Sequence, residues 1–312
     1  WGIRTLFGEV KLLSILEEFQ SKPPFIVSSA FPFKKTDEKY TYYLPKPIMK
    51  PIGFTDLEKL IETIKLEREL YHSKKFVIVQ LASRYKKFRK LRWVPFNIFK
   101  KTTRNLSEKE LFRDYLEGWF KNPNYAEIGA TQRNSIDRLV TSTSGSGETF
   151  YSVESFFRED HGLYFFLKTN NMDEYLLSVL KFLEDSGIGP NARTGKNWFT
   201  VDINETSLLD GAETESFITL SRCVGIDTID TSKSFYRIVP VRSKVESRQE
   251  FAGQDIWKDK VMYFEEGSTI KPDKKVDFYG SLVPVKKIAG KTIYQYGYAY
   301  PVWVHQGVKY EM

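Results

Sequence analysis

The sequence predicts an α+β fold of tandem ferredoxin-like (RRM-like) domains, the first with inserted helices and a glycine-rich loop, the second rich in strands. Residues 126–204 predict the first domain, because strand, loop, strand, strand, helix, glycine-rich loop and strand follow one another there. From about residue 207 onward, short apolar segments alternate with turns, which is typical of a β-rich unit. We therefore expect two domains, 1–206 and 207–312, although no Pro/Gly linker marks the boundary.

The chain opens with a pattern that predicts a helix. Apolar residues recur at the helical period through Val10, Leu13, Leu16 and Phe19. Because the chain enters this helix almost at once and starts at Trp1 without a Met, we expect further residues to precede it. Short strands or extended segments are expected next, at 24–33 and 40–45, with prolines marking their ends.

Two capping boxes predict helices further along. Thr55 with Glu58 predicts a helix over 55–71. Ser107 with Glu110 predicts a second helix, whose inner face is expected to carry Leu111, Tyr115, Leu116 and Trp119. The apolar segment between the two helices, 76–82, is expected to be a short strand or a buried segment.

Residues 126–157 predict two strands around a tip at 141–148, whose Ser, Thr and Gly residues suit an exposed mobile loop. We then expect a strand at 162–168, a helix at 172–185 that Gly187 terminates, and a strand at 198–204. The inner face of that helix is expected to carry Leu176, Val179, Leu180 and Leu183. In the tail, strands are expected within 215–224, 234–243, 260–267 and 292–304.

The positive charge of the chain is concentrated in one segment. Residues 74–104 hold 11 Lys or Arg and no Asp or Glu, and the remainder holds 36 basic and 40 acidic residues. A basic stripe on a neutral body is the usual footprint of a polyanionic partner, although a charge run is often only a solvated face. The aromatic residues Tyr85, Phe88, Trp93 and Phe96 alternate with the charges, which favours nucleic acid over a membrane.

The segment GIGPNARTGKNWF, 187–199, has the composition of a phosphate-binding loop. A nucleotide cofactor is not expected here: Gly189 and Gly195 enclose five residues, Asn197 follows Lys196, and a strand follows where a helix would be needed. Ala192 also breaks the dinucleotide pattern. A nucleic-acid phosphate remains possible, because glycines expose backbone N–H groups and basic residues supply charge, and an ordinary helix cap with a β-turn is an equal alternative.

Other residue types exclude several classes of protein. Cys223 is the single cysteine, so the chain can form no internal disulfide and no cysteine-based metal site. No His, Asp or Glu cluster has metal-ligand spacing, and we expect no cofactor. No apolar run is long enough to span a bilayer, and the sequence shows no charged-then-apolar pattern typical of a signal peptide. We therefore expect a soluble, cytoplasmic protein.

Several segments resemble the RAMP superfamily of CRISPR proteins, which carries such a glycine-rich loop between the last helix and last strand of a ferredoxin-like domain. Within this superfamily, the segments are similar to the fourth subunit of the Csm (type III-A) interference complex. The resemblance covers residues 1–200 well and the tail only loosely, and its segments are PPFIVSSAFPF (23–33), YLPKP (43–47), KKFRKLRWVPFNIF (86–99), NSIDRLV (134–140), FYSVESF (150–156) and DSGIGPNARTGKNWF (185–199). The family usually has a glycine where Pro190 stands and another near Asn197. Because proline has no N–H to donate, we expect the side chains of Arg193, Thr194 and Lys196 to contribute more to phosphate binding than the backbone N–H groups do.

The resemblance implies a non-catalytic subunit that binds the 5′ handle of the CRISPR RNA (crRNA) and caps one end of the effector complex. It implies contacts with the large signature subunit and a backbone RAMP subunit, indirect contact with target RNA, and a hairpin that lies across the guide. Asp137 would then orient Arg138 or Arg133, and an ordinary acidic residue in a surface turn is an equal alternative. The candidate RNA-binding residues are Gly187, Gly189, Asn191, Arg193, Thr194, Gly195 and Lys196 of the loop, Arg133, Asn134 and Arg138 of the hairpin, and Arg84, Lys86, Lys87, Arg89, Lys90 and Arg92 of the basic stripe. Further contacts are conceivable at Tyr42, Tyr43, Lys46 and Lys50, although a core or solvated position is favoured for each of them.

Two alternatives stay open at this point. One is a RAMP endoribonuclease that processes precursor crRNA, for which histidine is the usual acid or base. The three histidines, His72, His161 and His305, lie in no recognisable catalytic constellation, so we expect no enzyme. The other alternative is the equivalent subunit of the Cmr (type III-B) complex, which would share the mechanism and differ in its neighbours.

Overall fold

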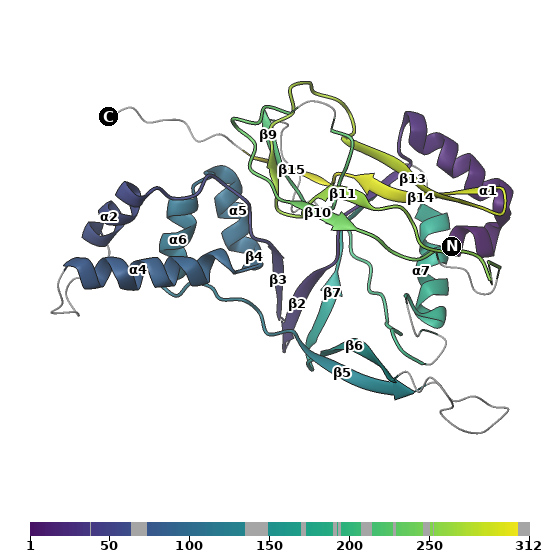
Figure 1. The fold of residues 1–312 in the computed structure, drawn as a ribbon, viewed down its shortest axis with the longest axis horizontal. Coiled ribbons are helices and arrows are strands. Elements are labelled where there is room, and N and C mark those ends of the chain that lie inside the picture. Colours follow the sequence, from purple (N-terminus) through teal and green to yellow (C-terminus); the bar gives the residue numbers. More distant parts are fainter. Residues whose placement is uncertain are drawn as a thin grey trace.

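The computed structural model describes residues 1–37, 39–63, 74–134, 149–169, 173–189, 192, 195–206, 214–226, 229–245, 250–251 and 253–304. Helices and strands are mixed along the chain, which confirms the predicted α+β class (Figure 1). No helix within these residues is long and apolar enough to cross a membrane.

A four-stranded antiparallel sheet lies at the centre of the molecule, in the order β4-β3-β2-β7. Its strands are β2 (Phe31–Thr36), β3 (Lys39–Pro45), β4 (Trp93–Pro95) and β7 (His161–Tyr164). The extended segments predicted at 24–33 and 40–45 are therefore confirmed, and the first of them also contains β1 (Phe25–Val27). The strand predicted at 162–168 is divided, because β1 pairs with a separate short strand, β8 (Leu167–Thr169).

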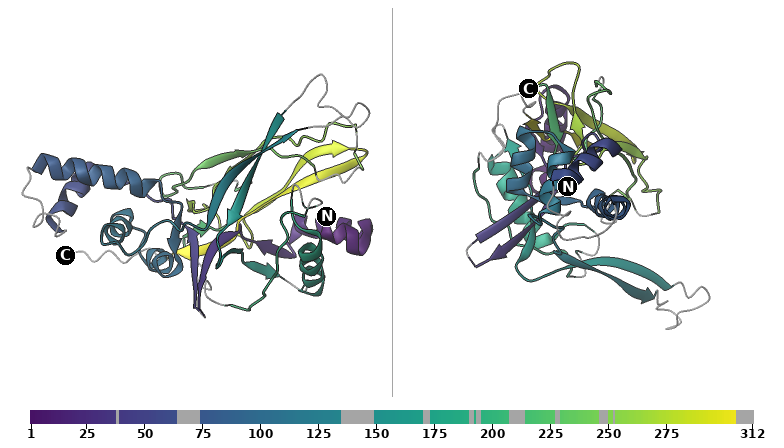
Figure 2. Two further views of the ribbon diagram at one scale, coloured as in Figure 1. Left: turned by 90° about the horizontal axis from the view of Figure 1, so that it is seen from below. Right: turned by 90° about the vertical axis from the view of Figure 1, so that its left-hand side faces the viewer.

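Four helices of the described part of the chain form a module at one end of the molecule (Figures 1 and 2). They are α2 (Phe54–Thr63), α4 (Lys74–Arg89), α5 (Phe96–Arg104) and α6 (Glu108–Leu116). α2 confirms the first part of the helix predicted at 55–71, and the end of that prediction lies outside the described residues. α6 begins as predicted, since the Ser107 hydroxyl accepts the Glu110 N–H at 3.3 Å. Trp119 follows the end of α6 and is exposed, so its predicted place on the inner face is wrong.

The apolar segment 76–82 is helical, so the strand is wrong, and the alternative of a buried segment holds for one face of the helix only. It forms the first half of α4, where Val77 and Leu81 are buried and Phe88 continues the same face. Val79 lies on the other side and is exposed. Burial at a spacing of four residues is the signature of a helix face, and the unbroken run of apolar letters concealed it.

The hairpin predicted over 126–157 is confirmed. β5 (Ala126–Asn134) pairs antiparallel with β6 (Thr149–Phe157), and the predicted tip at 141–148 lies outside the described residues. Among the described residues the two strands pair only with each other, and the hairpin projects from the body of the molecule (Figure 2).

The helix predicted at 172–185 is confirmed as α7 (Asp173–Ser186), with Leu176 buried. The strand predicted at 198–204 is wrong, because residues 198–206 have no regular secondary structure. Trp198 and Ile203 in this segment are exposed, so no sheet covers them. Since this strand would complete the first ferredoxin-like unit, the tandem ferredoxin-like arrangement stays a prediction.

The N-terminal helix is confirmed as α1 (Gly2–Ser21), but its apolar face differs from the expected one. Ile15 and Phe19 are buried, whereas Leu13 is exposed and Val10 is 84% exposed. Gly8 (φ 84°, ψ 172°) breaks the helix before all of these residues, so they share one continuous helical stretch. In a helix of 3.6 residues per turn, the three-residue spacing from Val10 to Phe19 drifts around the axis, and Val10 therefore lies opposite Phe19.

The tail forms three small antiparallel sheets, which confirms strands in all four predicted segments. The sheets are β12-β9-β15, β10-β11 and β13-β14. Their strands are β9 (Ser216–Thr219), β10 (Ile238–Val241), β11 (Val261–Phe264), β12 (Thr269–Ile270), β13 (Gly280–Ile288), β14 (Lys291–Tyr298) and β15 (Pro301–Val304). The sequence did not predict β13, whose ladder with β14 shifts register between Pro284 and Lys286.

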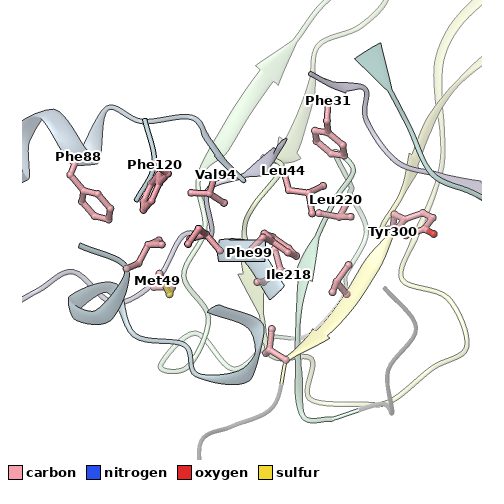
Figure 3. Close-up of a cluster of buried hydrophobic side chains, with 14 of the residues drawn as sticks. Phe31, Leu44, Met49, Phe88, Val94, Phe99, Phe120, Ile218, Leu220 and Tyr300 are labelled. Carbon is pink, nitrogen blue, oxygen red and sulfur yellow. The ribbon is translucent and has the colours of Figure 1, made fainter. Parts of the chain in front are cut away.

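One hydrophobic cluster joins the helical module, the central sheet and the tail. Phe99 of α5 and Leu44 of β3 are fully buried in it, together with Ile218 and Leu220 from the tail (Figure 3). The predicted boundary at residue 206 stays a prediction, but the residues on its two sides share this cluster.

We expect Ile218→Ala to destabilise the whole protein by roughly 2–5 kcal/mol, since it leaves a cavity in the shared cluster. Chemical denaturation followed by both tryptophan fluorescence and circular dichroism should give one coincident transition at lower denaturant. Val10→Ala, at an exposed position, serves as the control and should change little. Two separate transitions, with only one of them moved, would contradict a shared core.

Candidate functional site

The glycine loop, residues 187–197, starts where Gly187 ends α7. The Gly187 N–H donates to the Leu183 carbonyl at 2.9 Å, and Gly187 has a φ of +69°. A Cβ at this position would lie 3.1 Å from the Ala192 Cβ and from the Trp198 ring. The predicted helix stop is therefore confirmed, and both conformation and space favour glycine there.

The two ends of the loop are held together by the backbone. The Ile188 N–H donates to the Asn197 carbonyl at 3.3 Å, and Asn197 adopts a positive φ of 62°. Gly189 and Gly195 also have positive φ, and a Cβ on Gly195 would meet nothing within 4 Å. Three predicted ligands, Asn191, Arg193 and Thr194, lie outside the described residues.

One carboxylate connects the glycine loop to the hairpin. The Lys196 ammonium is ion-paired with Glu154 of β6, and the Arg133 guanidinium of β5 lies 3.2 Å from the same carboxylate. The Ser152 hydroxyl donates to it at 3.1 Å. The hydrogen bond from Lys196 is the main reason why the pKa of Glu154 lies below its ordinary value. The structure thus brings Lys196 and Arg133 together, whereas Asn134 is exposed at the end of β5 and Arg138 lies outside the described residues.

The sequence analysis missed Glu154. Only the strand alternation within 149–157 could have indicated it, since Ser152 and Glu154 share one face of β6. The outer face of the hairpin carries Ile128, Tyr151 and Val153, all of which are exposed. Trp198 was also missed and is 66% exposed two residues after Lys196.

The basic stripe lies on the second half of α4 and the turn that follows it. All six of its residues are exposed, and among the described residues none of them forms an ion pair with a carboxylate: Arg84, Lys86, Lys87, Arg89, Lys90 and Arg92. The aromatic residues between them are largely internal, since Phe88 is fully buried and Tyr85 is half-buried. The stripe therefore offers charge, and Phe88 is not available for stacking.

The structure separates the predicted interface into two surfaces. α4 lies on one side of the central sheet, and α7 with the glycine loop lies on the other (Figures 1 and 2). The loop and the hairpin therefore form one candidate surface, which we call the loop–hairpin site. The stripe forms a second, purely basic surface.

No protein-family model matches the chain. It is 25% identical over 282 residues to the CRISPR system Cms protein Csm4 of Thermococcus onnurineus (strain NA1), covering 89% of this chain and 79% of that protein. The fold of this chain is similar to that of a chain in a crystal structure of a Csm1-Csm4 cassette in complex with cA4, with a TM-score of 0.54. The two chains are 20% identical, and the match covers 98% of this chain and 88% of the other. A Csm3-Csm4 subcomplex of the type III-A CRISPR-Cas interference complex gives a TM-score of 0.51, 16% identity and coverage of 96% and 89%.

The chain is thus similar to Csm4 of CRISPR systems in sequence, and to chains of Csm4-containing complexes in fold. The predicted resemblance is thereby confirmed.

In the Csm4-like chain, Lys46 is not part of an exposed basic track. It is half-buried beside α4, with its ammonium 4.3 Å from the centre of the Phe88 ring. Nearby, buried Glu108 accepts hydrogen bonds from the Tyr85 hydroxyl at 2.5 Å and from the Ile52 N–H at 2.9 Å. Burial lowers the pKa of Lys46 to about 8, against the attraction of Glu108.

Of the three histidines, the structure describes His161. Its Nδ1 lies 2.8 Å from the Glu159 carbonyl oxygen at the start of β7. The described residues contain no group of three His, Cys, Asp or Glu side chains placed to hold a metal ion. Cys223 is buried, which raises the pKa of its thiol to about 12 and keeps it protonated.

The lowered pKa of Lys46 predicts a pH dependence of stability. Between pH 8 and 10 the unfolded chain, with a lysine pKa near 10.5, binds more protons than the folded chain, so the free energy of unfolding should rise with pH. One proton contributes at most about 1.4 kcal/mol per pH unit. Urea denaturation at several pH values should show this slope in the wild type, relative to Lys46→Met, which keeps the packing on Phe88. Parallel profiles for the two proteins would show that Lys46 is not held in this environment.

Proposed function

We propose that this Csm4-like chain is a non-catalytic, RNA-binding subunit of a type III-A CRISPR effector complex. It holds the 5′ handle of the crRNA and caps one end of the complex, in antiviral defence. The observation that carries the proposal is the meeting of Lys196 and Arg133, from two separate elements, on one anionic group. Two cations placed in this way suit a backbone phosphate, and arginine adds directional hydrogen bonds.

Exposed aromatic side chains near the glycine loop and on the hairpin support an RNA strand as the ligand. Trp198 follows the glycine loop, and Tyr151 lies on the outer face of the hairpin. Single-stranded nucleic acid is held by cations along its backbone and by aromatic faces on which bases stack. A nucleotide-cofactor site is disfavoured because no helix begins after the loop, in the described residues 198–206, to receive phosphates at its N-terminus.

The basic stripe on α4 supplies a second, sequence-independent attraction for RNA. Its six exposed cations have no carboxylate partner among the described residues, so an approaching polyanion displaces mobile counterions rather than protein side chains. Because the stripe lies across the central sheet from the loop–hairpin site, we assign it to RNA beyond the segment that the loop holds.

The relatives support the proposed protein partners. The similar chains were solved in a Csm1-Csm4 cassette and in a Csm3-Csm4 subcomplex. We infer that this chain contacts a large signature subunit on one surface and a backbone RAMP subunit on another, with crRNA running between them. Target RNA then reaches the chain only indirectly, through its pairing with the guide.

Lys196→Ala should weaken binding of a single-stranded CRISPR-repeat RNA and flatten its salt dependence. Loss of one phosphate contact lowers the slope of log affinity against log salt by about 0.7 for single strands. Fluorescence anisotropy over a range of salt concentrations measures both quantities. Lys260→Ala removes the same charge from an exposed position in the tail and should leave the slope unchanged. An unaltered slope for Lys196→Ala would count against the loop as a phosphate site.

The RNA should stay intact during these measurements. The purified protein, incubated with labelled repeat RNA without added metal, should shift the RNA in a native gel and leave its length unchanged in a denaturing gel. A cut RNA would support the endoribonuclease alternative instead. His72→Ala and His161→Ala would then identify the catalytic histidine.

A further inference from the structure

The Glu154 carboxylate lies where the two strongest candidate phosphate ligands meet. One of its oxygens faces the Arg133 guanidinium at 3.2 Å and the Ser152 hydroxyl at 3.1 Å, and the other is paired with the Lys196 ammonium. Its side chain is 12% exposed, whereas those of Arg133 and Lys196 are 29% and 36% exposed. Both cations can therefore be reached from solvent, while their shared partner lies between them.

We propose that Glu154 is a placeholder for an RNA phosphate: its carboxylate holds Lys196 and Arg133 together in the free chain, and a backbone phosphate replaces it when RNA binds. This inference rests on the proposed RNA-binding function. A carboxylate and a phosphodiester are both singly charged and both present two acceptor oxygens, so the same donors serve either group.

The exchange is favourable because the ion pairs that must break are weak ones. Partly exposed pairs between flexible side chains contribute little to stability. An RNA strand also brings further phosphates and bases, so the loss of one internal pair is offset by several new contacts. In this exchange Glu154 loses its two cationic partners.

The exchange also changes how the hairpin is held. Among the described residues β5 and β6 pair only with each other, so the Lys196–Glu154 contact is a direct tie between the glycine loop and the hairpin. When a phosphate binds both Lys196 and Arg133, the bound RNA connects the glycine loop to the hairpin. Occupation of the loop is thereby coupled to the position of the hairpin.

Removal of the carboxylate distinguishes a competitor from a positioning residue. Fluorescence anisotropy with labelled single-stranded repeat RNA should show that Glu154→Gln binds about two- to fivefold more tightly than the wild type. Glu127→Gln removes the same charge from the same hairpin but touches Arg158 instead, so it measures the general effect of charge. The gain for Glu154→Gln should exceed that for Glu127→Gln, and it should shrink when Lys196→Ala is already present.

Each remaining outcome overturns a definite part of the account. If Glu154→Gln binds RNA no more tightly than Glu127→Gln, Glu154 plays no specific part in RNA binding. If it binds more weakly than the wild type, Glu154 positions Lys196. Either result would reject the placeholder. If Lys196→Ala still weakened binding, the proposed function would stand without it. Failure of the wild type to bind RNA would reject both. An unchanged melting temperature and circular dichroism spectrum for Glu154→Gln would exclude misfolding as the cause of weaker binding.

Discussion

The packing of α5 onto both the central sheet and the tail is the constraint on which the rest of the structure depends. α5 contacts β3 and β4 on one side and β15 on the other, and its Phe99 is fully buried in the shared cluster (Figure 3). This packing places α4, with its exposed cations, on one side of the sheet. α1, α7 and the glycine loop lie on the opposite side. The separation of the loop–hairpin site from the basic stripe is therefore a consequence of the core.

Local signals in the sequence were sufficient where neighbouring residues decide the conformation. The Ser107 cap and the Gly187 helix stop were predicted because each depends on residues a few positions apart. The hairpin over 126–157 was predicted because two strand-like segments flank a tip rich in Ser, Thr and Gly. The helix α4 was mistaken for a strand because apolar residues such as Val79 fill positions that face solvent, and this hides the helical period. The strand at 198–204 failed for a different reason: strand propensity is present, but no neighbouring strand is placed to pair with it.

The sequence predicted individual residues of the candidate site but not how they meet in the fold. The sequence identified Lys196 and Arg133 individually, but not that they meet, since their contact through Glu154 joins a loop to a hairpin far away along the chain. Glu154 could not be recognised, because a glutamate on an exposed hairpin resembles any solvated acid. The basic stripe was placed correctly on the surface, yet Phe88 within it is part of the core. Burial of this kind depends on tertiary packing, which composition does not report.

The central claim is that RNA is held at the loop–hairpin site, with the α4 stripe as a supporting surface. Photo-crosslinking of the wild-type protein to a repeat RNA containing 4-thiouridine, followed by mass spectrometry of the peptides, tests it without any substitution. The account predicts crosslinks in the peptides that contain Trp198 and Tyr151, with weaker crosslinks on α4. Crosslinks confined to α4 or to the tail strands would contradict the assignment of the glycine loop and hairpin as the place where the RNA is held.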